Sequence, residues 1–386
     1  MGQKLWWLAG LVLTVAIVLR SPPLGAAAFI LGGSVVVTSW WLGKVQHGLR
    51  VRHVAPETLG LGDQAQVLIE VTNTSLLPVP WVQIIDSVPL ALRTGAPFRM
   101  ALPLGAGATR RTSYTIKGGR RGYYHLGPLR LATGDVLGLY QRQLTAKPVY
   151  ITVFPQVLPV QDLRLPAQLP FGPLAAMQRR GEDPARPAGV RPYQSGDGVR
   201  RLDWKSTARV GDLLVRRAEP TIAPETTLAL AFRLEDYPAR VVKDSLERAV
   251  VTAASLGAAL LARKLPVGLV TNGVDPKNAE AAVVLPQGKG DGHLQMLLTL
   301  LGRIEAGNRG PLDALLASRP LPWGGTLALI TADLEPATLV PVNALRRRGQ
   351  NVAVFLLEAT PSGVALARSY HLRVYTVDQR GIPHAA

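Results

Sequence analysis

The chain has 386 residues, with 43 Lys and Arg against 26 Asp and Glu, so its formal net charge is +17. This length is enough for two or three domains with separate hydrophobic cores. The absence of cysteine excludes a disulfide scaffold, a thiolate metal site and a cysteine nucleophile.

Two uncharged apolar runs, 5–19 and 24–42, form the N-terminal part of the chain. The second run approaches the roughly 20 residues that a helix needs to cross a hydrocarbon core of about 30 Å, and the first run is shorter. Tryptophan pairs at 6–7 and 40–41 mark the outer ends of the runs, as expected for an interfacial aromatic belt. We therefore predict that residues 1–44 form a transmembrane helical hairpin in the lipid bilayer.

The distribution of basic residues predicts the orientation of this hairpin. Lys4 and Lys44 flank its outer ends, whereas Arg20 stands alone in the turn. The positive-inside rule then places the soluble domains in the cytoplasm. The alternatives are a buried helical hairpin of a soluble protein and a secretory signal peptide cleaved at 26–28. Cleavage would leave 29–42 as an exposed apolar N-terminus, which favours the membrane hairpin.

The segment 51–155 changes to short runs of β-forming residues separated by turn residues. Examples are 66–71, 81–85, 112–116 and 150–154. This spacing predicts a small antiparallel β-sandwich-like domain, a fold that serves for binding or spacing.

A proline-rich segment, 156–190, follows and is predicted to be an interdomain linker, because recurrent prolines interrupt regular elements. The next segment, 191–220, interleaves charges of both signs with aromatic residues. Its candidate partner-binding or interdomain residues are Tyr193, Gly196, Asp197, Arg200, Arg201, Asp203, Trp204, Lys205, Arg209, Arg216 and Glu219. The acids favour internal ion pairing with the arginines. The alternative is that the basic cluster receives an acidic partner, a phosphate or anionic lipid headgroups.

The segment 221–386 alternates short apolar strands with amphipathic helices. Strands are predicted at 227–232, 266–271, 326–331, 351–357 and 372–377, and helices at 239–264, 294–305 and 336–348. This alternation predicts a doubly wound α/β domain with a parallel sheet. Ligands of such folds bind beyond the carboxyl ends of the strands, and here those ends carry Glu235, Asp236 and Asp333.

Several motifs together resemble the domain of unknown function 58 family. They are Arg120-Arg121-Gly122-Tyr123, Gly134-Asp135, Val153-Phe154-Pro155, and above all Tyr193–Asp197 followed by Arg200–Arg209. The resemblance covers the whole chain and implies a bacterial inner-membrane protein with a C-terminal domain similar to a von Willebrand factor type A domain. Such proteins are often encoded beside a MoxR-type AAA+ ATPase and are viewed as its adaptors.

The metal site of von Willebrand type A domains is degenerate in this sequence. A Mg²⁺-binding member carries Asp-x-Ser-x-Ser after its first strand, but Phe232–Tyr237 contains no serine. Asp333 stands where a third-loop ligand would be, with Glu235 and Asp236 as the other acids of this degenerate site. We expect no cofactor, with Mg²⁺ as the alternative.

Other catalytic patterns are missing from the sequence. The six histidines have no zinc-binding spacing, and no Gly-x-Ser-x-Gly nucleophile elbow occurs. The arginine pairs are dispersed without a nucleic-acid reader motif. We therefore predict a membrane-anchored, non-catalytic adaptor whose partner is an AAA+ ATPase. The alternatives are a membrane-associated metal-dependent hydrolase that uses Asp333 with Glu235 or Asp236, and a membrane-tethered nucleic-acid-binding regulator.

Overall fold

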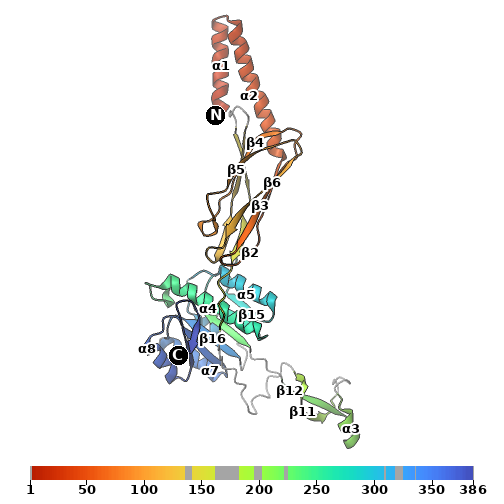
Figure 1. The fold of residues 1–386 in the computed structure, drawn as a ribbon, viewed down its shortest axis with the longest axis vertical. Helices are drawn as coiled ribbons and strands as arrows, with labels where there is room; N and C mark the ends of the chain where they lie inside the picture. The colour runs from red at the N-terminus through yellow and green to blue at the C-terminus, as the bar shows by residue number, and fades with distance from the viewer. Residues whose placement is uncertain are drawn as a thin grey trace. The chain divides into compact units, whose positions relative to one another are not determined.

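A computed structural model describes residues 2–134, 141–160, 182–194, 202–220, 225–307, 310–317, 325–334 and 336–385. The chain divides into two compact units, 1–155 and 156–386 (Figure 1). Together they form a mixed α/β protein with apolar N-terminal helices and several sheets.

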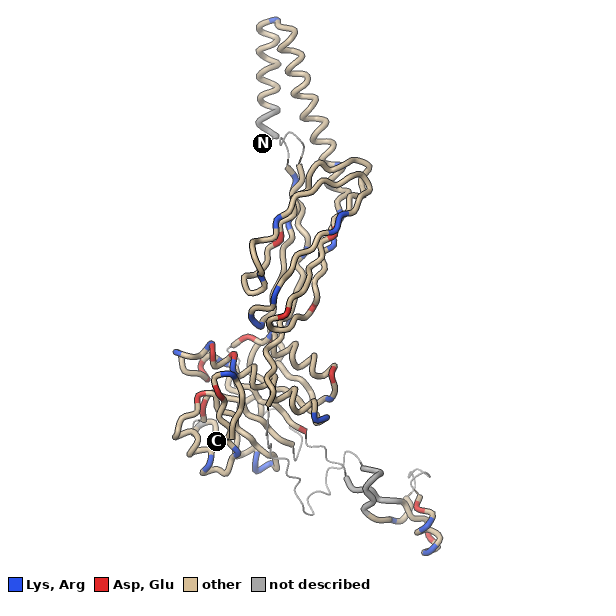
Figure 2. Tube along the Cα trace, in the orientation of Figure 1, with Lys and Arg blue, Asp and Glu red and all other residues tan. Residues whose placement is uncertain are grey.

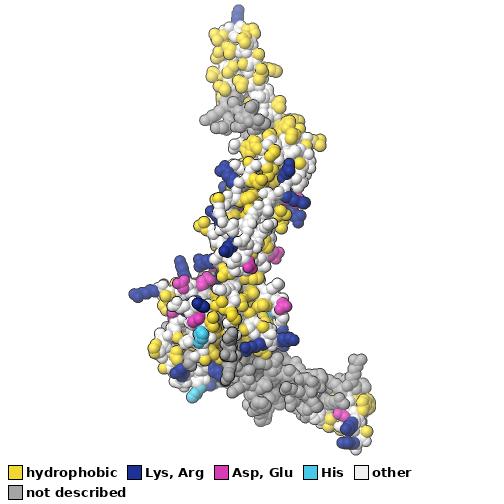
Figure 3. Space-filling view, in the orientation of Figure 1, with side chains coloured by type: hydrophobic (Ala, Val, Ile, Leu, Met, Phe, Trp, Pro, Cys, Tyr) yellow, Lys and Arg dark blue, Asp and Glu magenta, His cyan; other side chains and the backbone are white. Residues whose placement is uncertain are grey.

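The first unit begins with two apolar helices, α1 (Gly2–Val18) and α2 (Pro22–Gly48), which lie side by side (Figure 1). No acidic residue occurs in either helix, and Arg20 stands in the turn between them (Figure 2). Apolar side chains cover much of their visible surface (Figure 3).

Two described helices are long and apolar enough to cross a membrane: the part of α2 from Pro22 to Val45, and α4 (Val242–Ala262). Their surroundings differ. In α4, 67% of the apolar stretch is buried inside the second unit, whereas in α2 only 11% of the apolar stretch is buried. α1 is apolar from Trp7 to Val18 but shorter. Exposed apolar surface of this kind is compatible with membrane association.

The rest of the first unit is built from three sheets. Their orders are β1-β3-β6, β2-β10-β7 and β5-β4-β8-β9. The strands are β1 (Leu49–Val54), β2 (Thr58–Leu59), β3 (Gln64–Asn73), β4 (Val79–Ile85), β5 (Arg99–Leu104), β6 (Thr109–Lys117), β7 (Gly122–Leu126), β8 (Leu129–Gly134), β9 (Gln141–Ala146) and β10 (Val149–Val153), with a 3₁₀ turn, η1 (Leu90–Leu92), after β4.

The sheets of the first unit share buried cores, as in a β-sandwich. Ile69 and Val71 of β3 pack with Val82 and Ile84 of β4, and all four are buried. Alternate residues of β3 are exposed, which matches the alternation seen in the sequence. Antiparallel pairing dominates among the described strands of this unit, where β2 and β10 pair parallel.

The second unit begins at 156, and the predicted linker 156–190 is partly wrong. Residues 182–190 belong to strand β11 (Glu182–Pro192), which pairs antiparallel with β12 (Leu214–Pro220). The pairing register shifts on both sides of Pro187, because proline removes a donor from the ladder and is tolerated at such irregularities. Leu158 donates its amide to Ser255 Oγ of α4 at 2.9 Å, so the start of the segment is held to a helix. Residues 161–181 lie outside the described part.

The core of the second unit is a seven-stranded sheet of order β15-β14-β13-β16-β17-β18-β19. Its strands are β13 (Thr226–Leu230), β14 (Val267–Thr271), β15 (Val283–Gly288), β16 (Thr326–Thr331), β17 (Asn351–Leu356), β18 (Arg373–Val377) and β19 (Pro383–Ala385), and its further helices are α5 (Asp291–Arg303), α6 (Leu312–Ala317), α7 (Pro336–Arg347) and α8 (Pro361–Ser369).

Both faces of this sheet are covered by helices. Leu228 and Leu230 of β13 pack in a core with α4 and α5, whereas Ala229 packs in a second core with α6, α7 and α8. Successive side chains of a strand point to opposite faces, so strands buried on both faces read as continuous apolar runs. This explains why the sequence predicts these five parallel strands.

The edges of the sheet differ from the prediction of an all-parallel sheet. β15 pairs antiparallel with β14, and β19 pairs antiparallel with β18. β15 contains Pro286 and β19 has three residues, and neither pattern is typical of a strand. A mixed sheet with antiparallel edge strands is the result.

Candidate functional site

The most informative part of the second unit is the carboxyl edge of the parallel strands. Strand order reverses at β13, which lies between β14 and β16, and ligands of open α/β sheets bind beside such a reversal. Helical and loop segments that follow β13, β14, β16 and β17 bring Asp236, Asn272, Asp333 and Glu358 to this edge. The predicted acids thus follow neighbouring strands, as expected.

Asp236 is engaged by its own loop. It lies in the 3₁₀ turn η4 (Leu234–Asp236), where Arg233 Nη2 donates to its Oδ1 at 2.6 Å and Arg233 Nε donates to the same oxygen at 3.0 Å. Glu235 is 58% exposed and lies 3.8 Å from Arg233 Nε. The positive charge of Arg233 is therefore balanced within one short segment of the chain.

Asn272 connects the ends of β13 and β14. Its Oδ1 accepts the Phe232 amide at 2.6 Å, and its Nδ2 donates to Gly310 O at 3.1 Å and to Asp236 Oδ2 at 3.4 Å. Asn272 is 2% exposed, so these bonds satisfy groups that water does not reach. The sequence places Asn272 at a strand end but gives no signal of this bridging role.

Tyr237 follows Asp236 and is buried. Its hydroxyl donates to Ala231 O at 2.7 Å. Burial raises the pKa of Tyr237 above its ordinary value, and the charge of Asp236 raises it further. The hydroxyl consequently stays protonated and acts as a structural donor at this edge.

A second set of hydrogen-bonded residues links α4 to the loop after β17. Ser245 Oγ donates to Glu358 Oε1 at 2.5 Å, and Arg248 forms an ion pair with the same carboxylate. Arg248 Nη1 also donates to Leu357 O at 3.1 Å. These residues lie more than 100 positions apart in the chain, and the sequence pattern does not indicate that they meet.

Asp333 serves the start of α8. Thr360 Oγ1 donates to Asp333 Oδ2 at 2.6 Å, and the Leu334 amide donates to Oδ1 at 2.9 Å. Thr360 is the N-cap of α8, since its Oγ1 also accepts the Gly363 amide at 3.0 Å. A Cβ on Gly363 would lie 2.1 Å from Asp333 Oδ1, so glycine allows this close approach.

The three acids of the predicted degenerate metal site therefore have different roles. Asp236 pairs with Arg233, Glu235 is largely exposed, and Asp333 binds Thr360. Within the described ranges, no three acidic or histidine side chains come together in a way that could hold a metal ion. The donor set at this edge does not fit the octahedral oxygen coordination that Mg²⁺ requires.

The segment 191–220 forms the ribbon β11–β12 with a short helix, α3 (Trp204–Val210), at its end. Asp203 is the N-cap of α3, because its Oδ1 accepts the Ser206 amide at 3.0 Å. Thr207 Oγ1 accepts the Leu214 amide at 3.0 Å, so one side of α3 is attached to β12. Asp203 and Thr207 thus have local structural roles.

The other side of α3 is open. Trp204 is 62% exposed, and Lys205 and Arg209 are exposed beside it on the helix surface. Tyr193 at the end of β11 is 38% exposed. Gly196, Asp197, Arg200 and Arg201 lie outside the described residues, and Arg216 and Glu219 are described as backbone of β12 alone.

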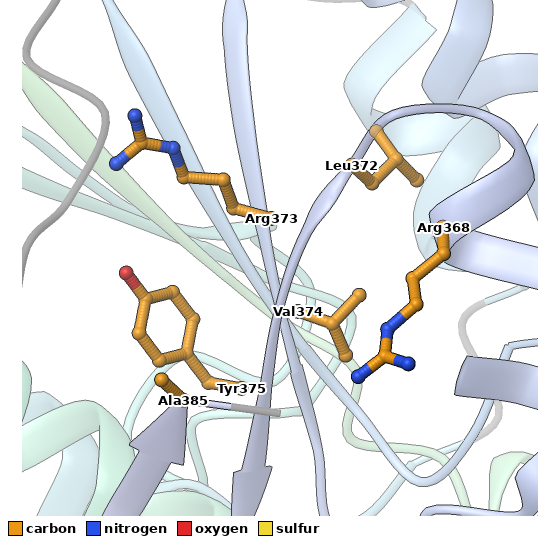
Figure 4. Close-up of a pocket in the computed structure, with 6 residues that line it drawn as sticks. All are labelled: Arg368, Leu372, Arg373, Val374, Tyr375 and Ala385. Carbon is orange, nitrogen blue, oxygen red and sulfur yellow. The ribbon is translucent and has the colours of Figure 1, made fainter. Parts of the chain in front are cut away.

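A shallow pocket of about 240 Å³ lies elsewhere, at the amino end of β18 (Figure 4). Its lining residues are Arg368, Leu372, Arg373, Val374, Tyr375 and Ala385. Figure 4 shows Arg368 and Arg373 on opposite sides of the strand. Burial raises the pKa of Tyr375, although Arg373 acts in the opposite direction. The pocket contains none of the predicted site residues.

The family model described as "Protein of unknown function DUF58" matches residues 189–363, from β11 into α8. The match includes the Tyr193–Arg209 motifs and confirms the predicted family resemblance. The chain is 26% identical over 254 residues to the uncharacterized protein YeaD of Bacillus subtilis (strain 168), which corresponds to 64% of this chain and 60% of that protein. The aligned part therefore spans less than two thirds of this relative.

Solved structures give weaker similarities. The CARDB domain of the PF1109 protein from Pyrococcus furiosus is 13% identical, with 27% of this chain and 91% of that chain covered and a TM-score of 0.21. A beta-glucosidase from Listeria innocua is 15% identical, with 28% of this chain and 16% of that chain covered and a TM-score of 0.19. Scores this low do not establish a common fold.

Proposed function

We propose that this chain is a membrane-anchored, non-catalytic adaptor of the bacterial cell membrane. In this proposal α1 and α2 form a transmembrane hairpin, and the soluble units lie in the cytoplasm. The C-terminal α/β domain acts as a von Willebrand factor A-like module that binds a protein partner, a MoxR-type AAA+ ATPase, in an envelope or stress-related assembly.

The exposed apolar surface of α2 supports the anchoring. Phe29 is 83% exposed and Ile30 is 70% exposed. Val37, about two turns further along the helix, is 59% exposed. In water such a surface would be costly, at about 25 cal/mol for each Å² of apolar area. A bilayer covers it. α4, by contrast, buries its apolar residues against the sheet and needs no membrane.

The observation that best supports a docking role concerns the acidic residues at the carboxyl ends of the parallel strands. They bind other groups of the same domain and so hold it together. Asp236, Asp333 and Glu358 are each bound by donors of the same domain. A general acid or base must instead reach a substrate proton. Internal pairs of this kind keep the domain rigid, which suits a module that presents a docking surface to a partner.

The open side of α3 is the proposed contact with the partner. Tryptophan and arginine are enriched among residues that dominate binding energies, and Trp204 and Arg209 are both exposed on α3. The cap at Asp203 and the bond to Thr207 hold this surface in place before binding, which lowers the entropic cost of association. Lys205 and Arg209 favour an acidic partner surface.

A pull-down from detergent-solubilised membranes tests this function. The full chain is compared with a chain lacking 191–386, which removes α3 together with the α/β domain. Both are tested in the presence of ATP and Mg²⁺, and retained proteins are identified by mass spectrometry. Retention of an AAA+ ATPase by the full chain alone supports the proposal. Absence of the ATPase from both samples contradicts it.

A further inference from the structure

The loop between β3 and β4, residues 74–78, has the sequence Thr-Ser-Leu-Leu-Pro and carries no charge. Leu76 in this loop is 94% exposed, the highest value for a large apolar side chain among the described residues. Its neighbour Leu77 packs against the sandwich core instead. A single exposed leucine is common on protein surfaces, so its position relative to α2 decides what it can contact.

Both ends of the loop contact α2. The Thr74 amide donates to Gly48 O at 2.8 Å, and Trp41 Nε1 donates to Pro78 O at 3.1 Å. A Cβ on Gly48 would lie 2.8 Å from the backbone nitrogen of Ser75, so glycine is needed for this approach. The loop therefore lies alongside the last two turns of α2, from Trp41 to Gly48, a distance of about 10 Å along the helix.

This position coincides with the end of the apolar part of α2, which runs from Pro22 to Val45. A helix that enters the hydrocarbon core at Pro22 leaves it after about 20 residues, close to Trp41. Tryptophan is enriched at that depth, where its ring meets the headgroups. Lys44 and Arg50 are exposed just beyond it and suit anionic headgroups.

The loop is also rigid, because Asn73 organises it. Asn73 is fully buried, its Nδ2 donates to Leu77 O at 2.8 Å and to Gly105 O at 2.9 Å, and its Oδ1 accepts the Ser75 amide at 3.0 Å. These bonds direct Leu77 inward and leave Leu76 outside. The backbone around Leu76 is consequently ordered before any contact is made.

We propose that the β3–β4 loop inserts Leu76 into the interfacial layer of the bilayer, beside the end of α2. The inference rests on the proposed membrane anchoring and adds a second, independent contact between the sandwich and the lipid. Insertion of Leu76 fixes the orientation of the sandwich on the membrane surface.

Single-cysteine labelling tests this inference cleanly, because the chain contains no cysteine. The full chain is prepared with Leu76→Cys, labelled with nitrobenzoxadiazole, and reconstituted in nanodiscs of phosphatidylcholine and phosphatidylglycerol. Leu90→Cys is the matched control: Leu90 is an 83% exposed leucine of the same unit, beyond the end of β4 that points away from the loop. Phe29→Cys on α2 reports on the anchoring itself.

We expect the label at 76 to show blue-shifted, severalfold brighter emission than the label at 90, and quenching by lipids with a nitroxide near the headgroup. Emission at 76 that equals emission at 90, with the label at 29 in the bilayer core, overturns the inference and leaves the anchoring intact. A label at 29 that stays in water overturns the anchoring, and the inference with it. All three positions are exposed, so the substitutions leave the fold unchanged.

Discussion

Replacement of Asn272 by alanine tests whether the carboxyl edge is held together as described. The substitution removes the bonds to the Phe232 amide and to Gly310 O, at a position where Asn272 is 2% exposed. Loss of hydrogen bonds at a site that water does not reach costs about 1–3 kcal/mol. We expect a loss of about 3 kcal/mol, or roughly a hundredfold in an opening equilibrium.

Hydrogen exchange of the full chain in detergent, read by mass spectrometry for peptides of β13 and β14, measures this loss, because exchange reports local opening. Asn278→Ala is the control, since Asn278 is exposed in a loop of the same unit. We expect it to change exchange little. If Asn272→Ala accelerates exchange by less than about fivefold, roughly 1 kcal/mol, the bridging role assigned to Asn272 is refuted.

Three further predictions concern other parts of the chain. Glu358→Ala removes the carboxylate that pairs with Arg248 and should lower the free energy of unfolding by about 2–3 kcal/mol, a smaller loss than for a fully buried pair. Denaturant titrations measure it, and an unchanged midpoint contradicts this. Burial acts to raise the pKa of Asp378, but hydrogen bonds from the Ile382 and Arg380 amides outweigh it, so the net effect is a lowered pKa. The ionised carboxylate should therefore stabilise the protein at neutral pH, and this contribution should disappear as the pH falls below about 4. Asp378→Ala should therefore lower Tm at pH 7 and make little difference at the acid end, and equal losses at both would refute the linkage. Gly48→Ala should destabilise the first unit by about 1–3 kcal/mol, whereas Gly43→Ala, where a Cβ has open space, should not; equal melting temperatures for the two variants would argue against the loop contact.

The parallel strands could be predicted because each is buried on both faces and reads as an apolar run. β15 and β19 could not, since Pro286 interrupts one and the other has three residues. α8 was missed for a similar reason: it is short and contains Gly363, which has low helix propensity. Thr360 is its N-cap, but threonine is also common in loops, so this residue alone did not predict a helix.

The candidate site was predictable as a place and not as a set of contacts. Strand ends are local features, so Glu235, Asp236 and Asp333 could be assigned to one edge of the sheet. The partners of these residues depend on the packing of helices and loops against that edge. Arg248 and Glu358 are 110 residues apart, and no local pattern predicts that they pair.

In the proline-rich segment, the sequence predicted an irregular linker where the structure has a strand. Three prolines at 184, 187 and 192 predict an irregular chain, yet β11 includes all of them. Register shifts around Pro187 accommodate a residue that cannot donate to the ladder. Proline counts alone therefore overestimate the length of a linker when a pairing strand lies nearby.

Direct binding of a purified MoxR-type AAA+ ATPase to the full chain in nanodiscs tests the adaptor proposal most directly. With ATP and Mg²⁺ present, we expect saturable binding that Trp204→Ala or Arg209→Glu weakens about tenfold or more, as for residues that dominate an interface. Arg347→Glu, an exposed charge reversal on α7, should leave the affinity unchanged. No binding by the unmodified chain would contradict the adaptor function, and equal binding by all variants would place the docking surface elsewhere than α3.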